Sequence, residues 1–417
     1  MNPFPLVLAD LRRNRPLAWL IVLLVALALA VGIMVISQER ALRQGSARAA
    51  DDFDLLIGAP GSPTQLVLST VYLQARAIPL LDGAVLAEVA RSPGVVHAAP
   101  IAFGDHWQGH PIVGTTADFA SRGGALEIGE GRIFQRRGEA VVGAAVPLAV
   151  GARIAPQHGH GGEHDGDHEE EEEDEDEEEH AGHADVRYTV VGRLPARHTI
   201  WDTAVLVPVE DVWAIHGQAD GHDIGEKRIG PPWNASRLPG VPAIAVKPAS
   251  VADAYVLRGR FRAPRSLALF PAEALNELYA ALGNARDLMS LLAVATQVLV
   301  VAAVLVTLLT GFLARRRRFA VLRAIGAPRR YVFATVWIEV AWLIGLGALL
   351  GLLLGYGAAA AFSRYLQGLA GFAMRASLGV EEFILAGSLA LSGGVLAILP
   401  AWWVFRRSIV DGLTGPH

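Results

Sequence analysis

The chain has 417 residues, 52% of them hydrophobic and only 18% charged, a balance too apolar for an ordinary soluble enzyme. It contains no cysteine, which excludes disulfide frameworks, thiolate metal sites, iron–sulfur clusters and cysteine nucleophiles. The formal net charge of -5 is set by one segment, Glu163 to Glu179, which holds 14 of the 41 acidic residues, whereas the rest of the chain is basic.

Four stretches are apolar over the roughly 20 residues that a helix needs to cross a bilayer, and each predicts a transmembrane helix. They are residues 17–37, 288–314, 331–363 and 383–405. Only the third contains a charged residue, Glu339. An ionised acid about 14 Å into a membrane is costly unless it is paired or hydrated. Glu339 is therefore a candidate for a functional role.

Arginines precede the first stretch, lie between the second and third, and follow the fourth. By the positive-inside rule both termini and the tail 406–417 are cytoplasmic, residues 38–286 are external, and residues 364–382 form a short external loop. Ala47-Arg48-Ala49 resembles a signal-peptide cleavage site, but the length of the first stretch favours a retained anchor. Residues 1–16 predict a short interfacial helix, the alternative being an unstructured basic leader.

Between the first two stretches, short β-type runs alternate with Gly and Pro and with helical segments, which predicts an α+β domain. We expect helices at 83–91 and 271–282, and strands at 95–102, 111–115, 139–143, 188–192 and 203–207, the first two paired around a turn-rich 104–109. The predicted fold class is an α-helical membrane protein with four transmembrane helices and a large extracytoplasmic α+β domain inserted between helices one and two.

An insertion at residues 156–185 is rich in histidine and acid and cannot bury a core. It follows Gly151 to Ile154 and precedes Val186 to Thr189, so it is expected at the tip of a hairpin. Eleven consecutive acids, Glu169 to Glu179, lie between its histidines. Neutral imidazoles suit zinc, copper or nickel, and carboxylates can complete the shell. The candidate ligands are His158, His160, His164, His168, His180 and His183. The alternative is a solvated insertion with no selected ligand.

Other histidines of the external domain could form a second, ordered metal site. His106 and His110 lie near Asp105 and His97 around the predicted turn. Exposed histidines at such a turn are more often plain surface residues, and His198, His216 and His222 have the same status. Both interpretations stay open from the sequence.

Residues 315–330 form the most informative cytoplasmic segment. A helix that puts Phe319, Leu322 and Ile325 near one face and stops at Gly326 and Pro328 would lie under the membrane and could transmit force to a partner. The alternative is a plain basic loop that satisfies the positive-inside rule.

Here the chain resembles the permease subunits of the MacB and FtsX-like class of ABC transporters. The resemblance rests on Arg317, Phe319, Leu322, Arg323, Ala324, Gly326, Ala327, Glu339, Gly345, Gly351 and Gly355, and near the end on Leu399-Pro400-Ala401, Arg406-Arg407 and Val410 to Leu413. The external domain matches more weakly, at Gly114-Thr115, Gly131-Arg132 and Val190 to Gly192. Arg318 stands where the class commonly has an acid, and Ile409 where it has proline, which questions the usual polar contact to the ATPase and the geometry of the tail.

The resemblance implies a multi-pass inner-membrane permease with a MacB-like periplasmic domain and a coupling helix that docks on a separate ABC ATPase. The expected coupling residues are Arg317, Phe319, Leu322, Arg323, Ile325, Gly326 and Ala327. It also implies a homodimer embedded in membrane lipid. Acids near the position of Glu339 are common in the class, so the resemblance offers a structural contact to the coupling region as the alternative to a functional role. Neither lysine of the chain follows a glycine, as a phosphate-binding Walker loop requires, so ATP is expected in the partner chain. We expect no intrinsic cofactor, no catalytic site and no nucleic-acid partner.

The predicted function is mechanotransmission, in which ATP hydrolysis in the partner moves the external domain. The insertion suggests a substrate or signal linked to Zn²⁺ or a similar divalent metal. Two alternatives stay open: an FtsX-like regulator that activates an external partner such as a cell-wall hydrolase, and a permease that extracts lipoproteins.

Overall fold

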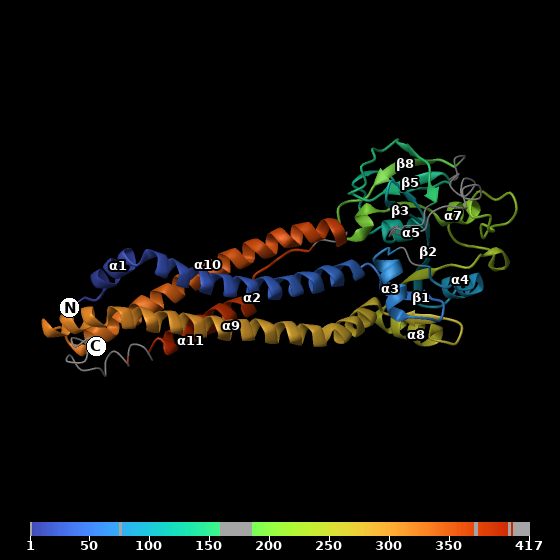
Figure 1. Ribbon diagram of the computed structural model, residues 1–417. Coiled ribbons are helices and arrows are strands. Elements are labelled where there is room, and N and C mark those ends of the chain that lie inside the picture. Colours follow the sequence, from blue (N-terminus) through green and yellow to red (C-terminus); the bar gives the residue numbers. More distant parts are fainter. Residues whose placement is uncertain (1, 75–76, 159–185, 371–373, 399–401, 403–417) are drawn as a thin grey trace, which may run out of the picture. The chain divides into compact units, whose positions relative to one another are not determined.

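The computed structural model describes residues 2–74, 77–158, 186–370, 374–398 and 402. Within these ranges the side chains at 158, 281–290, 293, 300, 308–309, 311–320, 323, 367–370 and 396 lie outside the description. The chain divides into two compact units (Figure 1). The helical unit comprises Met1–Gln44, Leu282–Leu369 and Met374–His417, and the sheet unit comprises Gly45–Ala281 and Ala370–Ala373. The compact core of the predicted external domain is thus shorter than 38–286 at both ends.

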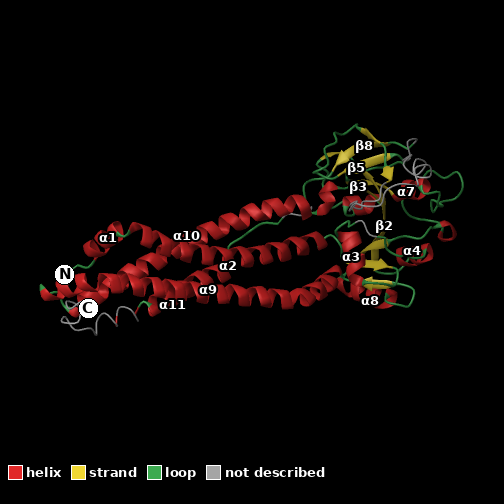
Figure 2. Ribbon diagram, viewed as in Figure 1, coloured by secondary structure: helices red, strands yellow, loops and turns green. Residues whose placement is uncertain are grey.

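Helices make up the described part of the helical unit, and most of them are long (Figure 2). They are α1 (Phe4–Arg13), α2 (Arg15–Ala50), α9 (Pro271–Ala324), α10 (Arg329–Ala370) and α11 (Val380–Leu396), of which α2 and α9 continue into the sheet unit. In the described part of the chain, α2 and residues 329–366 of α10 are long and apolar enough to cross a membrane, and α9 contains a shorter apolar stretch, Val294–Thr307. The count of four transmembrane helices stays a prediction.

Helix boundaries differ from the predicted ones in two places. No proline follows Pro271 before Pro328, so the expected helix 271–282 is the first part of α9, and the expected coupling helix is the last part of α9 rather than a separate helix. The connection predicted at 364–382 is shorter in the structure, because α10 extends to Ala370 and α11 begins at Val380. Glu382 stabilises that early start, since its Oε2 accepts the backbone N–H of Gly379 at 2.8 Å.

Close approach of α2 and α10 depends on three glycines four residues apart, Gly347, Gly351 and Gly355. A Cβ at Gly351 would lie 2.8 Å from the carbonyl oxygen of Ala26, and one at Gly347 would lie 2.7 Å from Cβ of Val25. Small residues at this spacing let helix backbones pack closely in membranes. Gly345, which carries the family resemblance, has open space at its Cβ position and does not belong to this contact.

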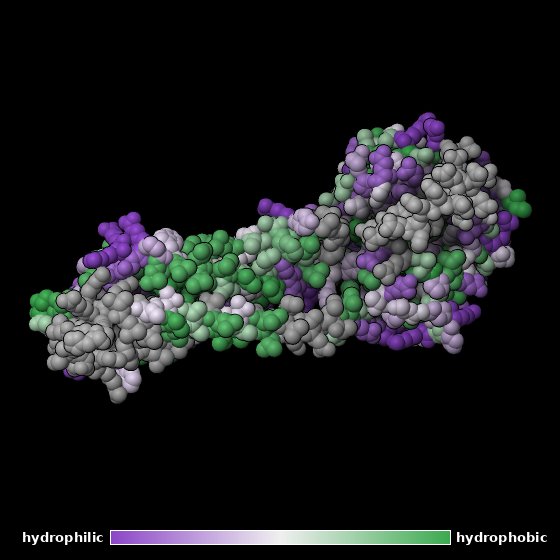
Figure 3. Space-filling view, viewed as in Figure 1, coloured by the Kyte–Doolittle hydropathy of each residue, from purple (hydrophilic) through white to green (hydrophobic). Residues whose placement is uncertain are grey.

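Hydrophobic side chains gather over the helical unit on the face drawn in Figure 3. On α2, Trp19, Leu23 and Leu27 are each more than half exposed, whereas Leu29 and Ile33 on another side of the same helix are buried in the unit's core. A helix that is apolar all round, with one side packed and the other open, fits a lipid environment.

A mixed sheet organises the sheet unit, with the order β11-β1-β10-β2-β3-β9-β5-β8-β4; β6 also pairs with β8 and β7 with β2. Its strands are β1 (Leu55–Gly58), β2 (Val95–Trp107), β3 (His110–Thr115), β4 (Glu130–Gly131), β5 (Glu139–Val142), β6 (Arg153–Ile154), β7 (Gln157–His158), β8 (Tyr188–Arg193), β9 (Val205–Pro208), β10 (Ala243–Pro248) and β11 (Leu267–Leu269). The pairs β3–β9 and β5–β8 are parallel and the others antiparallel.

Short helices complete the sheet unit. They are α3 (Pro63–Val71), α4 (Gly83–Ala90), α5 (Ala117–Ser121), α7 (Val209–Ile215) and α8 (Val251–Phe261), with 3-10 turns η1 (Ile200–Thr203) and η2 (Ala235–Arg237). Side chains that alternate along the strands separate into two buried clusters, one containing Ile57 and Val246 and the other Leu56 and Ala245. The predicted α+β character is confirmed. The β2–β3 turn is tighter than 104–109, because a bulge between Phe103 and Asp105 lets β2 continue to Trp107.

Candidate functional site

A buried carboxylate fastens α2 to the first turn of α11. The side chain of Glu382 is 0% exposed. Arg40 Nη1 donates to its two oxygens at 2.8 and 3.0 Å, and Ser37 Oγ donates to Oε1 at 3.0 Å. A buried ion pair is stable only when further hydrogen bonds satisfy its charges, and here the Gly379 N–H and the Ser37 hydroxyl provide them.

The same turn of α2 also holds α10. Gln38 Nε2 donates to the carbonyl oxygen of Ala359 at 2.7 Å and to Ser363 Oγ at 3.0 Å. These bonds begin where the charge-free stretch of α2 ends at Ser37. We call Ser37, Gln38, Arg40, Ser363 and Glu382 the helix clamp, because together they tie α2, α10 and α11 to one another.

Beyond Gly45, α2 is fastened to elements of the sheet unit. Ser46 Oγ is hydrogen-bonded to the Tyr279 hydroxyl of α9, and Tyr72 donates its hydroxyl hydrogen to the carbonyl oxygen of Ser46 at 2.8 Å. Burial raises the pKa of Tyr72, so this phenol stays protonated and remains a donor. The last turns of α2 therefore connect directly to α3 and α9.

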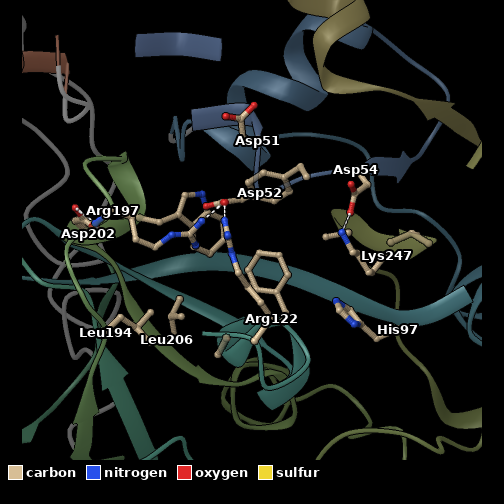
Figure 4. A pocket seen from close by; sticks show the side chains of 17 residues that line it. Asp51, Asp52, Asp54, His97, Arg122, Leu194, Arg197, Asp202, Leu206 and Lys247 are labelled. Carbon is tan, nitrogen blue, oxygen red and sulfur yellow. Dashed lines mark hydrogen bonds and ion pairs between the residues drawn. The ribbon is translucent and has the colours of Figure 1, made fainter. Parts of the chain in front are cut away.

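The residues that follow α2 line a cavity of about 230 Å³ in the sheet unit (Figure 4). Asp52 forms ion pairs with Arg122, which ends α5, and with Arg197. Asp54 Oδ2 lies 2.7 Å from Lys247 Nζ of β10. We call these ion-paired residues and the neighbouring aromatic rings the α2 socket. Its members are Asp52, Asp54, Arg122, Arg197, Lys247, Phe53, Phe119 and Trp201.

Aromatic rings pack against one another beside the ion pairs of the α2 socket. The ring of Phe53 lies 5.6 Å from Phe119 and 5.6 Å from Trp201, and these two rings are 5.3 Å apart. Trp201 Nε1 also donates to the carbonyl oxygen of Val71. Phe53 is 5% exposed, so the chain leaving α2 is held by apolar burial as well as by charge.

Burial shifts the pKa values of several titratable groups at the cavity, among them His97 and Asp202. Burial lowers the pKa of His97, which favours a neutral ring at neutral pH. Burial raises the pKa of Asp202, against the opposing effect of the backbone N–H groups that donate to its carboxylate, among them that of His198 at 2.7 Å. Asp202 thereby braces the loop that carries Arg197.

The coupling segment ends as the sequence predicts, at Gly326. α9 stops at Ala324, Gly326 has a φ of +104°, and the N–H of Ala327 bonds to the carbonyl oxygen of Leu322 at 3.1 Å. This is the glycine-terminated helix end known as the Schellman motif. Leu322 packs against the core of the helical unit, whereas Ile325 is 80% exposed. The side chains of Arg317, Phe319 and Arg323 lie outside the described residues.

Glu339 lies on α10 and is 4% exposed. Its neighbours along the helix, Val336, Val340 and Leu343, belong to the buried core of the helical unit. The choice between a functional and a structural role for this acid stays a prediction.

The base of the histidine-rich insertion is a hairpin, as predicted, because Ile154 pairs with Tyr188 and Arg153 with Thr189. His158 lies in β7, opposite Asp105 in β2. The other predicted ligands, His160, His164, His168, His180 and His183, lie outside the described residues, as do the C-terminal motifs from Leu399 to Ala401 and from Arg406 to Leu413.

The second histidine set does not come together. His110 Nδ1 lies 2.9 Å from the carbonyl oxygen of Thr203 and its ring stacks on Trp107, whereas His97 lines the cavity. Within the ranges that the structure describes, no three His, Asp or Glu side chains form a metal-binding group. Of the two interpretations that the sequence left open, the described side chains of His97, Asp105, His106 and His110 do not support a shared, ordered metal site.

Sequence reasoning missed the helix clamp and the α2 socket. A signal for the clamp was present, since Arg40 follows one charge-free stretch and Glu381-Glu382 precedes another, so opposite charges flank two predicted helices. The ion-pair partners of Asp52 in the α2 socket are Arg122 and Arg197. Both are distant in sequence, so no periodic spacing predicts these pairs.

Residues 290–409 match the family model described as FtsX-like permease C-terminal. We call this part of the chain the FtsX-like domain, after the family model that it matches. The match confirms the resemblance to the MacB and FtsX-like class, and the FtsX-like domain includes most of the apolar part of α9, all of α10 and α11, and Glu339 and Glu382. No curated protein matches the chain.

Among solved structures, the chain is similar to one titled "Crystal structure of the periplasmic region of MacB from Actinobacillus actinomycetemcomitans", with 8% sequence identity and a TM-score of 0.31. The likeness covers 55% of this chain and 94% of that chain. At this score it carries no argument about fold or function.

Proposed function

We propose that the chain is the permease subunit of an ABC transporter in which a separate ATPase drives motion of the external domain through α2 and α9. The FtsX-like domain supports a permease-type role and an ABC ATPase as partner. The observation that carries the mechanical part is the fastening of α2, a single helix from Arg15 to Ala50, by the helix clamp and again by Ser46 and the α2 socket.

The cytoplasmic end of this path is the α9–α10 turn. Ile325 offers an exposed apolar side chain next to a fixed helix end, which suits docking on the ATPase together with Arg317, Phe319, Leu322, Arg323, Gly326 and Ala327. In this proposal two copies of the chain associate in the inner membrane, with the sheet unit in the periplasm and both termini in the cytoplasm.

The composition of the histidine-rich insertion indicates the chemistry of the proposed substrate or signal. Six histidines and a run of acids suit Zn²⁺ or a similar divalent ion. The insertion grows from a hairpin of the same sheet to which the α2 socket belongs, so metal binding and ATP-driven motion act on one domain.

The test is ATP hydrolysis by the complex of the full-length chain with its copurified ATPase in liposomes. The proposal expects Zn²⁺ to change the hydrolysis rate of the wild-type complex, and expects this response to be lost when His158, His160, His164, His168, His180 and His183 are replaced by Gln. A response to an added cell-wall hydrolase would favour the regulator alternative, and a response to a lipoprotein would favour extraction.

A further inference from the structure

The cavity that follows α2 has both charged and apolar groups in its lining. In Figure 4 the side chains of Arg122 and Arg197 converge on the carboxylate of Asp52. The rings of Phe53 and Trp201 are among the apolar groups that line the same space. Its volume of about 230 Å³ is several times the roughly 30 Å³ that a water molecule takes up in the liquid, so the space suits a small organic molecule.

The two arginines have more hydrogen-bonding capacity than Asp52 uses. Each guanidinium group carries several N–H donors, and together they exceed what one carboxylate accepts. Among the residues that the structure describes, neither arginine side chain has a hydrogen-bond acceptor other than Asp52. The side chain of Arg122 is 40% exposed and that of Arg197 is 20% exposed, so the remaining donors are within reach of a second anion.

The other acids at the cavity do not take these donors. The carboxylate of Asp202 accepts backbone N–H groups, and that of Asp54 is paired with a lysine of β10. Asp51 is exposed and acts on Arg122 through its charge, but it is not ion-paired with it. Asp52 is thus the one carboxylate that contacts both guanidinium groups in the described part of the chain, and one positive charge is left without such a contact.

The lining selects a carboxylate that is joined to an apolar group. A guanidinium group matches the geometry of a carboxylate and binds it through two parallel hydrogen bonds. Phe53 is 5% exposed and Trp201 is 6% exposed, so the aromatic part of the lining is already formed by packing within the sheet unit. Small-molecule sites commonly combine a largely apolar lining with a few convergent polar groups.

We propose that this cavity binds a small organic carboxylate with an aromatic or aliphatic group, and that the ligand shares Arg122 and Arg197 with Asp52. The negative charge of Asp52 opposes the ligand, and by the reciprocity of coupled binding the ligand weakens the hold of the two arginines on Asp52. Asp52 comes two residues after α2 ends at Ala50, so the ligand acts on the fastening of α2. This consequence rests on the proposed function, in which α2 transmits motion, whereas the binding itself does not.

The experiment measures binding of 3-phenylpropanoate to the full-length chain in detergent by isothermal titration calorimetry. Asp52→Asn should bind the probe several-fold more tightly than the wild type, because the opposing charge is gone and both guanidinium groups remain. Arg197→Gln should bind it at least about tenfold more weakly. The matched control is Arg265→Gln, which removes a 68% exposed arginine of the same unit and should change nothing. The uncharged 3-phenylpropan-1-ol should bind the wild type at least about tenfold more weakly than the carboxylate.

Equal affinities of wild type and Asp52→Asn would overturn the proposal, as would equal binding of the alcohol or no binding by either protein. Unfolding midpoints without the probe identify a variant that fails to fold, and Arg122→Gln takes the place of Arg197→Gln in that case. If 3-phenylpropanoate binds as expected but leaves ATP hydrolysis by the complex with the copurified ATPase unchanged, the binding site stands and transmission through α2 fails.

Discussion

Glu382 is the side chain on which several contacts of the helix clamp converge. It is fully buried, and it accepts hydrogen bonds from Arg40, Ser37 and the backbone of Gly379. Removal of one partner of a buried ion pair is strongly destabilising because the other charge is left behind. Loss of one charged residue of the clamp therefore also destabilises the charged residue that it leaves behind.

Glu382→Ala is expected to lower the free energy of unfolding by about 3 kcal/mol, since among the described carboxylates Arg40 then keeps only the exposed Glu381 as a partner. Unfolding followed by circular dichroism in mixed micelles measures this. Glu381→Gln is the matched control, because its side chain is 59% exposed and a surface pair contributes under about 1 kcal/mol. Equal effects of the two changes would contradict the buried role of Glu382.

Asp211 gives the sheet unit a pH dependence. Burial, the largest effect, raises the pKa of Asp211 from 3.8 to about 6, although the Gly138 N–H donates to its Oδ2 at 2.8 Å. The folded chain therefore holds a proton that the unfolded chain releases between pH 4 and 6, so stability present below pH 4 is lost as the pH rises through 6.

In Asp211→Asn this loss should be absent. The pKa shift corresponds to about 3 kcal/mol of unfolding free energy. Between pH 4 and pH 7 the stability of the variant relative to the wild type should therefore rise by roughly that amount. Denaturant unfolding of the full-length chain at both pH values measures it, with the exposed Asp223→Asn as control. Parallel pH profiles of wild type and Asp211→Asn would show that burial of this carboxyl does not govern the dependence.

Among the elements, α2 and α10 pack through backbone contact that only glycine permits. Gly351→Ala places a Cβ 2.8 Å from the carbonyl oxygen of Ala26 and from Cβ of Leu29, and the backbone atom cannot rotate away. We expect a loss of about 1–3 kcal/mol in mixed-micelle unfolding. Gly345→Ala on the same helix has open space and should cost nothing. Similar losses for both would mean that the two helices do not pack this way.

The end of α9 makes a separate prediction for ATPase docking. Gly326 has a φ of +104° and no atom within 4 Å of an added Cβ, so Gly326→Ala acts through backbone strain of about 1–2 kcal/mol and not through a clash. The altered helix end should weaken binding of the ATPase to the solubilised chain several-fold, measured by surface plasmon resonance. Gly357→Ala, also in open space but inside α10, is the control. Undiminished binding by Gly326→Ala would separate this turn from docking.

Elements were predictable where the pattern is local. Long apolar runs located the middle of α2 and α10, and alternation with glycine breaks located β3, β5 and β8 to within a residue or two. Continuity was not predictable, because the sequence shows where a helix can stop but not that α9 crosses the expected boundary near Arg286. The pairs Arg40–Glu382 and Asp105–His216 depend on tertiary proximity, which periodicity does not report.

At the scale of the whole molecule, α2 is fastened by polar contacts at two places in its last third, whereas its stretch from residue 17 to residue 37 carries no charge. α2 meets α10 and α11 at the helix clamp, and it meets α3, α9 and the α2 socket after Gly45. A helix held in this way can carry displacement along its axis. The account therefore makes communication between the ATPase and the external domain depend on the clamp.

The most direct test is the Zn²⁺ response of ATP hydrolysis in proteoliposomes that contain the full-length chain and its copurified ATPase, compared between wild type and Glu382→Gln. The account predicts that the wild-type complex changes its hydrolysis rate on addition of Zn²⁺ to the side of the sheet unit, and that Glu382→Gln loses this change while still binding both Zn²⁺ and the ATPase. An equal Zn²⁺ response in Glu382→Gln would contradict transmission through α2.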